Sequence, residues 1–251
     1  MTITRTGHQQ VVRVQRREDL PQALLSRDLA GPRPVLVSVG GAGGMPADTG
    51  RAIDEFLTRY LVPLLDRAGV AVVDGGTDAG VMRAMGRARS AVGARFPLIG
   101  VAAEGTVIMP DDPHPAGHEA PLEPNHTVTI LVPGKSWGEE SPWLSDVASA
   151  LSGTTSSVTL LTNGGEITYD DAARSLESGR PLLVLAGTGR TADAIVDAAH
   201  GESDDPRARA IAASPLTRVV PLIQPGLVLQ AVAETLDVPV GQAGTVAPDA
   251  G

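Results

Sequence analysis

Short apolar runs alternate with longer amphipathic segments along the chain. The apolar runs are rich in Val, Leu and Ile, as expected of strands buried on both faces, and they predict strands at residues 11–14, 35–39, 70–73, 98–102, 127–132, 158–161, 182–186 and 219–222. Helical periodicity predicts helices at residues 20–29, 53–65, 79–91, 145–151, 169–176, 192–199 and 227–236. Strands that alternate with helices predict an α/β fold, in which helices cover both faces of a doubly wound, mostly parallel sheet of about seven or eight strands.

The helix predicted at residues 53–65 has the clearest pattern. Its apolar residues recur at helical spacing, but Pro63 lies among them and predicts a kink. Asp48 and Thr49 are candidate N-caps for this helix, and Gly69 is placed to end it.

The alternation of strands and helices runs to about residue 240 without a strong boundary. A polar stretch at residues 201–206 is the best candidate for one, but the segment that follows is too short to fold alone. We therefore expect a single domain over residues 1–240 and a loose tail over residues 241–251.

Glycine clusters follow four of the predicted strands, at residues 40–44, 75–80, 163–165 and 187–189. In a parallel sheet these turns lie at the same edge, where open α/β sheets bind their ligands. Glycine allows close backbone approach, and each turn opens a helix whose free amide groups and dipole attract anions. The clusters therefore indicate a site for a ligand with more than one phosphate group. The alternative is that glycine only makes tight turns between strand and helix.

Composition narrows the classes of function. The chain of 251 residues has no cysteine, which excludes disulfides, thiolate zinc sites and cysteine nucleophiles. A net charge of −9 and an aromatic content of 2% argue against a nucleic-acid partner, which favours basic surfaces and stacking side chains. No apolar run approaches the ~18 residues that span a bilayer, and the N-terminal residues lack the apolar core of a signal peptide. We therefore expect a cytoplasmic protein without a membrane partner.

Several short motifs occur in an order that is typical of one family. They are Gly40-Gly41-Ala42, Asp74 to Met82, Leu98 to Ala102, Pro124-Asn125-His126, Asn163-Gly164-Gly165 and Gly187 to Asp193. Over roughly residues 34–200, the chain resembles the N-terminal cytoplasmic homology region of melastatin-type TRP channels. That region belongs to the SLOG (LSDAT) superfamily, together with the lonely-guy phosphoribohydrolases and the DNA-processing Smf proteins. We expect a stand-alone prokaryotic relative with a Rossmann-like fold that binds a nucleotide-derived ligand, which in some channel members is ADP-ribose.

The resemblance also implies which residues bind the ligand. Those that would line the nucleotide are Gly40, Gly41, Ala42, Gly75, Gly76, Thr77, Gly80, Val81, Met82, Asn125, Gly187 and Gly189. Gly164, Gly165 and Thr168 would form a phosphate loop, and Arg190 would face the phosphate. The physical chemistry agrees for Arg190, because a guanidinium matches phosphate geometry whereas an idle cation in the first turn of a helix opposes the helix dipole.

The phosphate loop departs from the enzymes of the superfamily. The lonely-guy enzymes carry P-G-G-x-G-T-x-x-E, whereas residues 163–171 read N-G-G-E-I-T-Y-D-D. Ile167 replaces a glycine, Asp171 stands where the catalytic glutamate would be, and the enzymes' catalytic arginine motif has no visible counterpart. The alternative function is therefore a nucleotide N-glycosidase that uses Asp171 as its acid.

Three hypotheses remain open. The main one is a sensor or carrier that binds ADP-ribose or an NAD-related nucleotide and requires no cofactor. The N-glycosidase is the second, and an interaction protein whose crevice is blocked by Ile167 is the third. Related folds also lead us to expect a homo-oligomer.

Other candidate motifs favour structural interpretations. Residues 187–192 fit the dinucleotide fingerprint G-x-G-x-x-A, but they lie late in the chain and no acid follows at a strand end, so a dehydrogenase is disfavoured. His114 and His118 lie near two aspartates at a spacing that suits a metal. A solvated loop or a lid over the crevice is the favoured interpretation, and we expect no metal.

Three residues near the expected crevice have both a structural and a functional interpretation, and two acids have a structural one alone. His126 is either a hydrogen-bonded residue at a strand end or a ligand contact. Trp137 and Trp143 either cover the site or pack in the core, which is the default for rare aromatic residues. Glu139 and Glu140 are expected to be a solvated pair.

Overall fold

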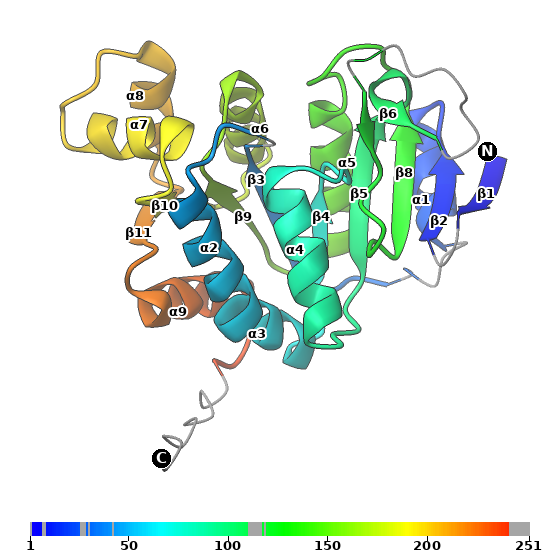
Figure 1. Cartoon of the computed structure of the whole chain (residues 1–251), viewed down its shortest axis with the longest axis horizontal. Helices are drawn as coiled ribbons and strands as arrows, with labels where there is room; N and C mark the ends of the chain where they lie inside the picture. The colour runs from blue at the N-terminus through cyan, green and yellow to red at the C-terminus, as the bar shows by residue number, and fades with distance from the viewer. Residues whose placement is uncertain are drawn as a thin grey trace.

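One nine-stranded sheet runs through the chain in the computed structural model, which describes residues 2–6, 9–25, 29, 31–41, 43–109, 117 and 119–240. Its strands are β1 (Thr2–Thr6), β2 (Gln9–Arg13), β3 (Val35–Gly40), β4 (Ala71–Asp74), β5 (Leu98–Ala103), β8 (Val128–Val132), β9 (Ser157–Thr162), β10 (Leu182–Ala186) and β11 (Thr217–Pro221). Their order across the sheet is β1-β2-β8-β5-β4-β3-β9-β10-β11, and every neighbouring pair is parallel except β1 and β2 (Figure 1). These eight parallel strands confirm the expected doubly wound α/β fold, and β6 (Val107–Ile108) and β7 (Ala120–Pro121) form a separate small ladder.

Helices cover both faces of the sheet (Figure 1). One face carries α1 (Leu20–Leu25), α5 (Ser141–Ser152), α6 (Glu166–Glu177), α7 (Arg190–Ala199) and α8 (Pro206–Ala212). The other face carries α2 (Ala47–Phe56), α3 (Val62–Arg67), α4 (Gly80–Ala91) and α9 (Pro225–Leu236). Within the described part of the chain, no helix has both the length and the apolar character to cross a membrane.

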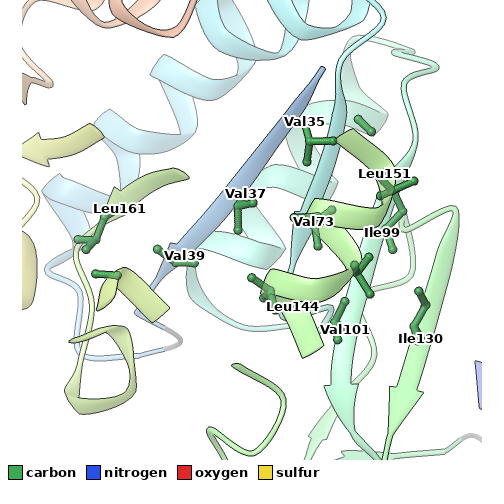
Figure 2. Packing of buried hydrophobic residues seen from close by; sticks show 14 of the residues in the cluster. Val35, Val37, Val39, Val73, Ile99, Val101, Ile130, Leu144, Leu151 and Leu161 are labelled. Carbon is green, nitrogen blue, oxygen red and sulfur yellow. The ribbon is translucent and has the colours of Figure 1, made fainter. Parts of the chain in front are cut away.

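Alternate residues of the central strand β3 enter two different cores. Figure 2 shows Val35, Val37 and Val39 on the face that packs against Leu144 of α5. Leu36 points to the other face and joins the core beneath α2, α3, α4 and α9. Burial on both faces explains why the sequence of β3 is almost entirely apolar. Because both faces are covered by helices, a ligand can approach β3 at its carboxyl end.

Besides the two-residue strands β6 and β7, the pattern did not predict the strand β1 and the helix α8. The edge strand β1 has the sequence TITRT, and its threonines and arginine hide the alternation that marks a strand. Helix α8 directly follows the polar stretch at residues 201–206 and is only 7 residues long, with Ala208 and Ile211 as its buried residues. Both elements are too short or too polar to produce a periodic signal.

The helix expected at residues 53–65 is divided. Helix α2 ends at Phe56, a π-helical turn spans Leu57–Leu61, and α3 begins at Val62. Pro63 has no N–H and its ring would clash with the carbonyl group four residues earlier, so the widened turn accommodates it in place of a simple kink.

The structure also shows where this helical segment begins and ends, which bears on the predicted N-caps Asp48 and Thr49 and on the predicted end at Gly69. The expectation that Asp48 and Thr49 cap α2 is wrong, because the helix already begins at Ala47, after Pro46. Asp48 therefore lies in the first turn, where its charge complements the helix dipole. Gly69, with a φ of +63°, follows the end of α3 as expected.

Candidate functional site

A pocket of about 310 Å³ opens at the carboxyl edge of β3, β4 and β9. Three of the predicted glycine turns meet there, namely the turns that follow these three strands. The rest of the wall comes from the first turn of α6, from Arg190 at the start of α7 and from the segment before α5. The pocket therefore lies where open α/β sheets bind ligands.

The fourth glycine turn, after β10, lies outside this pocket lining. The carboxylate of Asp193, in the first turn of α7, accepts hydrogen bonds from the N–H of Gly187 at 2.8 Å and of Gly189 at 2.9 Å. The anion position at this helix N-terminus is thus filled by the protein's own side chain. Gly187 instead lines a separate apolar surface pocket with Phe56 and Tyr60.

Arg190 is the one basic side chain among the described residues that line the pocket. Its Nη1 donates to the carbonyl oxygen of Gly43 at 2.7 Å, which connects the start of α7 to the turn after β3. The backbone at Arg190 has a φ of 55°, a left-handed conformation that is costly for a residue with a side chain. Strain of this kind concentrates at functional sites, so Arg190 is held here against its local preference.

The residues before α7 brace the turn between β9 and α6. Asn163 donates from its backbone N–H to Thr188 Oγ1 at 2.8 Å and from Nδ2 to the Thr188 carbonyl at 2.6 Å. Thr191 Oγ1 donates to the carbonyl oxygen of Gly165 at 3.0 Å. A Cβ at Gly164 would lie 2.8 Å from the Cβ of Thr191, so this position has no room for a side chain. The turn therefore has a single well-defined backbone path into α6.

The first turn of α6 faces the pocket with Gly165, Glu166, Ile167 and Thr168. The Gly165 N–H donates to Thr168 Oγ1 at 3.0 Å and the Thr168 N–H to the Gly165 carbonyl at 3.1 Å, whereas the amides of Glu166 and Ile167, the first two of the helix, have no intrahelical acceptor. These amides and the helix dipole form a binding position for an anion. Glu166 adds a negative charge at this end, but it is paired with Arg207 of α8 at 2.6 Å.

Gly40 and Gly41 are required by the close approach of two strand ends. A Cβ at Gly40 would lie 2.0 Å from the carbonyl oxygen of Thr162, and a Cβ at Gly41 would lie 2.4 Å from Asn163 Oδ1. Gly43, by contrast, has open space around it. For the first two positions, packing of β3 against β9 already explains the residue type without a ligand.

Besides Glu166, two further carboxyl groups line the pocket: Asp171 from α6 and Glu140 from the turn before α5. Burial raises the pKa of Asp171 to about 7, and repulsion from Glu140 adds to this shift. Burial also raises the pKa of Glu140, whose Oε2 accepts a hydrogen bond from the Gly138 N–H at 2.9 Å. The expectation that Glu140 is fully solvated is therefore wrong. The pocket combines an anion-attracting end with carboxyl groups that are easily protonated.

Thr77 combines burial with a hydroxyl group that lacks a partner. Thr77 lines the pocket and is 1% exposed. Thr77 Oγ1 forms no hydrogen bond with any residue that the structure describes. Buried polar groups without a partner cost free energy and are rare in folded proteins. A polar molecule bound in the pocket would supply the missing partner.

The two tryptophans have different surroundings. Trp143 packs against the core beneath α5, as expected for a rare aromatic residue. Trp137 lines the pocket and is 38% exposed, so its ring offers a flat apolar surface at the pocket wall.

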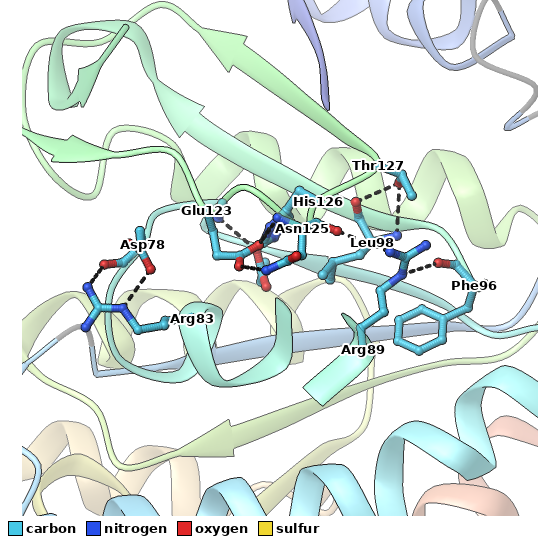
Figure 3. Close-up of polar contacts among 11 residues, drawn as sticks. Asp78, Arg83, Arg89, Phe96, Leu98, Glu123, Asn125, His126 and Thr127 are labelled. Atoms are coloured by element: carbon cyan, nitrogen blue, oxygen red, sulfur yellow. Dashed lines mark hydrogen bonds and ion pairs between the residues drawn. The ribbon is translucent and has the colours of Figure 1, made fainter. Parts of the chain in front are cut away.

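His126 lies in a buried cluster behind the turn that follows β4 (Figure 3). Its Nε2 is 2.7 Å from Asp74 Oδ1, and its Nδ1 is 2.8 Å from Glu123 Oε2. Burial alone would lower the pKa of His126, but the charges and hydrogen bonds of the two carboxylates outweigh burial and raise the pKa to about 9. Of the two interpretations of His126, the hydrogen-bonded strand-end residue is the one that the geometry supports.

A comparison with protein families agrees with this architecture. The family model described as "SLOG in TRPM, prokaryote" (LSDAT) matches residues 33–230. The chain belongs to this SLOG family. The match confirms the resemblance and extends it beyond residue 200, through α8 and β11 into α9. No curated protein matches the chain.

The geometry of this SLOG domain divides the residues expected to bind ligand into two groups. Those that line the pocket are Gly40, Gly41, Gly75, Thr77, Met82, Gly165, Thr168, Asp171 and Arg190. Those outside its lining are Gly76, Gly80, Val81, Asn125, Gly164, Gly187 and Gly189. Ala42 lies outside the described residues. Gly76, Asn125 and Gly164 support the lining from behind, because they hold or pack against the turns that form it.

The sequence analysis missed other lining residues of the SLOG domain, among them Ser38, Gly43, Glu140, Leu144 and Glu166. Ile167 also lines the pocket but leaves the volume of about 310 Å³ open, so it does not block the crevice. His114, His118 and the neighbouring aspartates lie outside the described residues. Within the described ranges, no group of three or more His, Asp and Glu side chains is arranged to hold a metal ion.

Proposed function

We propose that the pocket binds a nucleotide-derived ligand that carries phosphate, such as ADP-ribose or an NAD-related dinucleotide, and that the protein acts as a sensor or carrier of this ligand. The observation that carries the proposal is the convergence of Arg190 and the first turn of α6 on one pocket that also contains the partnerless hydroxyl of Thr77. Two independent elements thus supply attraction for an anion, and a third supplies a polar contact.

The phosphate would bind between α6 and Arg190. The amides of the first turn of α6 suit a phosphate oxygen, and a guanidinium binds phosphate through parallel N–H donors. Within the described part of the chain, the hydrogen bond to Gly43 uses one of the five N–H donors of Arg190. The remaining donors are available for phosphate.

The sugar and base would bind along the rest of the wall. Thr77 and the carboxyl groups of Asp171 and Glu140 suit the hydroxyls of a ribose, and the exposed ring of Trp137 suits stacking against a base. A volume of about 310 Å³ lies at the small end of ligand sites, which typically span about 300–1,000 Å³. It accommodates a mononucleotide unit, and the second half of a dinucleotide would extend over the open side of the pocket.

Membership of the SLOG family and the net charge of −9 support a small nucleotide rather than a nucleic acid as the partner. No cofactor is required for binding. The proposal places the protein in the cytoplasm, where such nucleotides are available, and a homo-oligomer remains part of it.

Isothermal titration of the purified protein with ADP-ribose, NAD, AMP and cyclic ADP-ribose tests the proposal. We expect at least one of these ligands to bind and to raise the midpoint of thermal unfolding, because a ligand that binds only the folded state stabilises it. Absence of binding by all of them at millimolar concentration contradicts the proposal.

A second candidate function is hydrolysis of the N-glycosidic bond of a nucleotide. Asp171, with a pKa of about 7, can be present in either protonation state near neutral pH, and Glu140 provides a second carboxyl group. In this reaction the bond between C1′ and the base nitrogen breaks, water supplies oxygen to C1′, and the base leaves with the electron pair and takes up a proton. Incubation with AMP and NAD, followed by chromatography for free base, tests this candidate; no release, or release that Asp171→Asn leaves unchanged, contradicts it.

A further inference from the structure

The turn after β4 is attached along its length to the segment before β8. The Glu123 N–H donates to the Gly76 carbonyl at 3.0 Å, and the Asp78 N–H donates to the carbonyl of Pro121 at 2.7 Å. A bridge between Thr77 and residue 122 lies between these two bonds. The two segments are far apart in sequence, so this attachment decides the path of the turn that carries Thr77 into the pocket.

The ring of His126 stands at the centre of this attachment. It lies between Asp74, the last residue of β4, and Glu123, and all three side chains are at most 2% exposed. Asp74 Oδ1 also accepts the Gly76 N–H at 2.7 Å. Glu123 Oε2 also accepts the backbone N–H of Asn125 at 2.8 Å. The ring therefore connects two carboxylates that each hold a different backbone segment.

With Asp74 and Glu123 both ionised, both ring nitrogens carry a proton in this arrangement. An ionised carboxylate only accepts hydrogen bonds, whereas a neutral imidazole has one donor and one acceptor nitrogen. In a neutral ring, one lone pair would face a carboxylate oxygen at less than 3 Å, inside a region shielded from water. A ring that donates through both nitrogens gives each carboxylate one hydrogen bond from the imidazolium, while Asp74 Oδ2 has no partner among the residues that the structure describes.

The other groups that pack around the ring do not change this balance. Arg89 approaches from α4, where its Nη1 donates to the carbonyl of Asn125 at 3.2 Å and its Nε to the carbonyl of Phe96 at 2.9 Å (Figure 3). Gly100 of β5 lies beside the ring, and Thr129 of β8 lies beside Gly100; both residues are neutral. Among the residues that the structure describes, the charged groups that face the ring are thus Asp74 and Glu123, with Arg89 beyond Glu123.

The turn has little freedom to compensate for a change in the cluster. Gly76 has a φ of +67°, and a Cβ on it would lie 2.8 Å from the Cα of Gly100. Gly75 and Thr77, on either side of it, both line the pocket. Displacement of Gly76 would therefore move two residues of the pocket wall together.

We propose that His126 is a positioning residue of the pocket: its ring, bonded through both nitrogens to Asp74 and Glu123, holds residues 75–77 in the conformation that presents the Thr77 hydroxyl to a ligand. The part of this inference that concerns ligand affinity rests on the proposed function, whereas the part that concerns the turn does not. Loss of a ring proton at high pH has the same consequence as loss of the side chain.

The experiment compares the wild-type protein with His126→Gln and with the matched control His200→Gln, which changes an exposed histidine at the end of α7. Both N–H donors of glutamine are on one nitrogen, so its side chain cannot reproduce the two donors on opposite sides of the imidazolium ring. Nuclear magnetic resonance of the ring should show two N–H protons on His126 at pH 8, where exposed histidines are neutral. The Gly76 amide should exchange with solvent about 10-fold faster in His126→Gln than in the wild type and His200→Gln.

Titration with ADP-ribose between pH 8 and pH 10 supplies the ligand readout. We expect wild-type affinity to fall above about pH 9, and His126→Gln to bind about 10-fold more weakly at pH 8 with no further fall above it. His200→Gln should match the wild type throughout. A structural role without positioning would lower stability but leave the pH profile of binding in place.

Specific results would overturn the inference. Detection of a single ring proton on His126 at pH 8 in the wild type overturns it. This measurement uses the wild-type protein and therefore does not require that His126→Gln folds. The inference is also overturned if a folded His126→Gln protein exchanges the Gly76 amide at the wild-type rate. The same holds if its ligand affinity depends on pH as that of the wild type does. If no nucleotide binds the wild type at any pH while the ring and amide results hold, the proposed function fails and the positioning of the turn is still supported.

Discussion

The guanidinium of Arg190 donates to the carbonyl oxygen of Gly43 at 2.7 Å, across 147 positions of sequence. This bond joins the start of α7 to the turn after β3, and both belong to the wall of the same pocket. Arg190 is itself exposed, and an exposed arginine without a partner extends into solvent, where its side chain keeps its conformational freedom. That Arg190 instead crosses to a neighbouring turn, from a left-handed backbone, makes it the residue whose substitution tests the phosphate position most directly.

Arg190→Ala should weaken binding of ADP-ribose or AMP by about 10- to 100-fold, because charge-assisted hydrogen bonds to phosphate are lost. Arg59→Ala, at an exposed arginine that is paired with Glu55, is the matched control and should leave affinity unchanged. Isothermal titration measures both. Equal affinities for the two variants would remove Arg190 from the phosphate position.

Arg190→Gly should be more stable than Arg190→Ala by about 1 kcal/mol, because the φ of 55° is costly for a residue with a Cβ and is open to glycine. Both variants lose the guanidinium, so the comparison isolates the backbone. Urea unfolding measures the difference. Equal stability of the two variants would mean that the backbone relaxes at this position and stores no strain.

Gly40→Ala should lower the free energy of unfolding by about 1–3 kcal/mol, because its Cβ would lie 2.0 Å from the Thr162 carbonyl oxygen and would separate β3 from β9. Gly43→Ala is the matched control on the same turn, has open space around it, and should change stability by at most about 0.5 kcal/mol. Thermal or urea unfolding distinguishes them. A Gly40→Ala protein as stable as Gly43→Ala would contradict the packing explanation of this glycine.

The sequence allowed most of the fold to be predicted because its strands are buried on both faces. A strand such as β3 is a mostly apolar run followed by glycine, a pattern that is typical of a buried parallel strand that ends in a turn. Strand β1 and helix α8 carry no such signal. The position of the pocket followed from the same logic, since the carboxyl ends of parallel strands meet at one edge.

The composition of the pocket wall was less predictable, because it depends on contacts between distant segments. The glycine turn after β10 looked equivalent to the others, but Asp193 occupies its amides. Glu140 looked like one of two solvated acids, yet the turn through Gly138 brings it to the pocket while Glu139 stays exposed. The spacing of residues along the sequence does not predict either contact. For the turn after β10, however, an aspartate a few residues after the glycines is a feature of the sequence that suggests such hydrogen bonds.

The His126 cluster makes stability depend on pH. The pKa of His126 is about 9 in the folded protein and about 6.5 when unfolded, so the folded state binds the proton more tightly. The stabilisation is therefore fully present below about pH 6.5 and is lost as pH rises from there through about 9, for a total of about 3 kcal/mol. Urea unfolding of the wild type and His126→Gln at several values from pH 6 to pH 10 measures it. A difference in stability between the two proteins that does not shrink with rising pH would contradict the assignment.

Asp171 should make binding of ADP-ribose depend on pH in the range around neutrality. Its pKa is about 7, so its side chain is mostly neutral at pH 6 and mostly charged at pH 8, next to a site for an anion. ADP-ribose is the suitable probe, because its pyrophosphate keeps a constant charge in this range whereas a phosphate monoester titrates near pH 6. We expect wild-type affinity to be about 3- to 10-fold higher at pH 6 than at pH 8. The Asp171→Asn protein should lose this difference. The control Asp170→Asn, at an exposed neighbour outside the pocket lining, should retain it. If Asp171→Asn keeps the wild-type slope, or Asp170→Asn loses it, the carboxyl group that senses pH in the pocket is not that of Asp171.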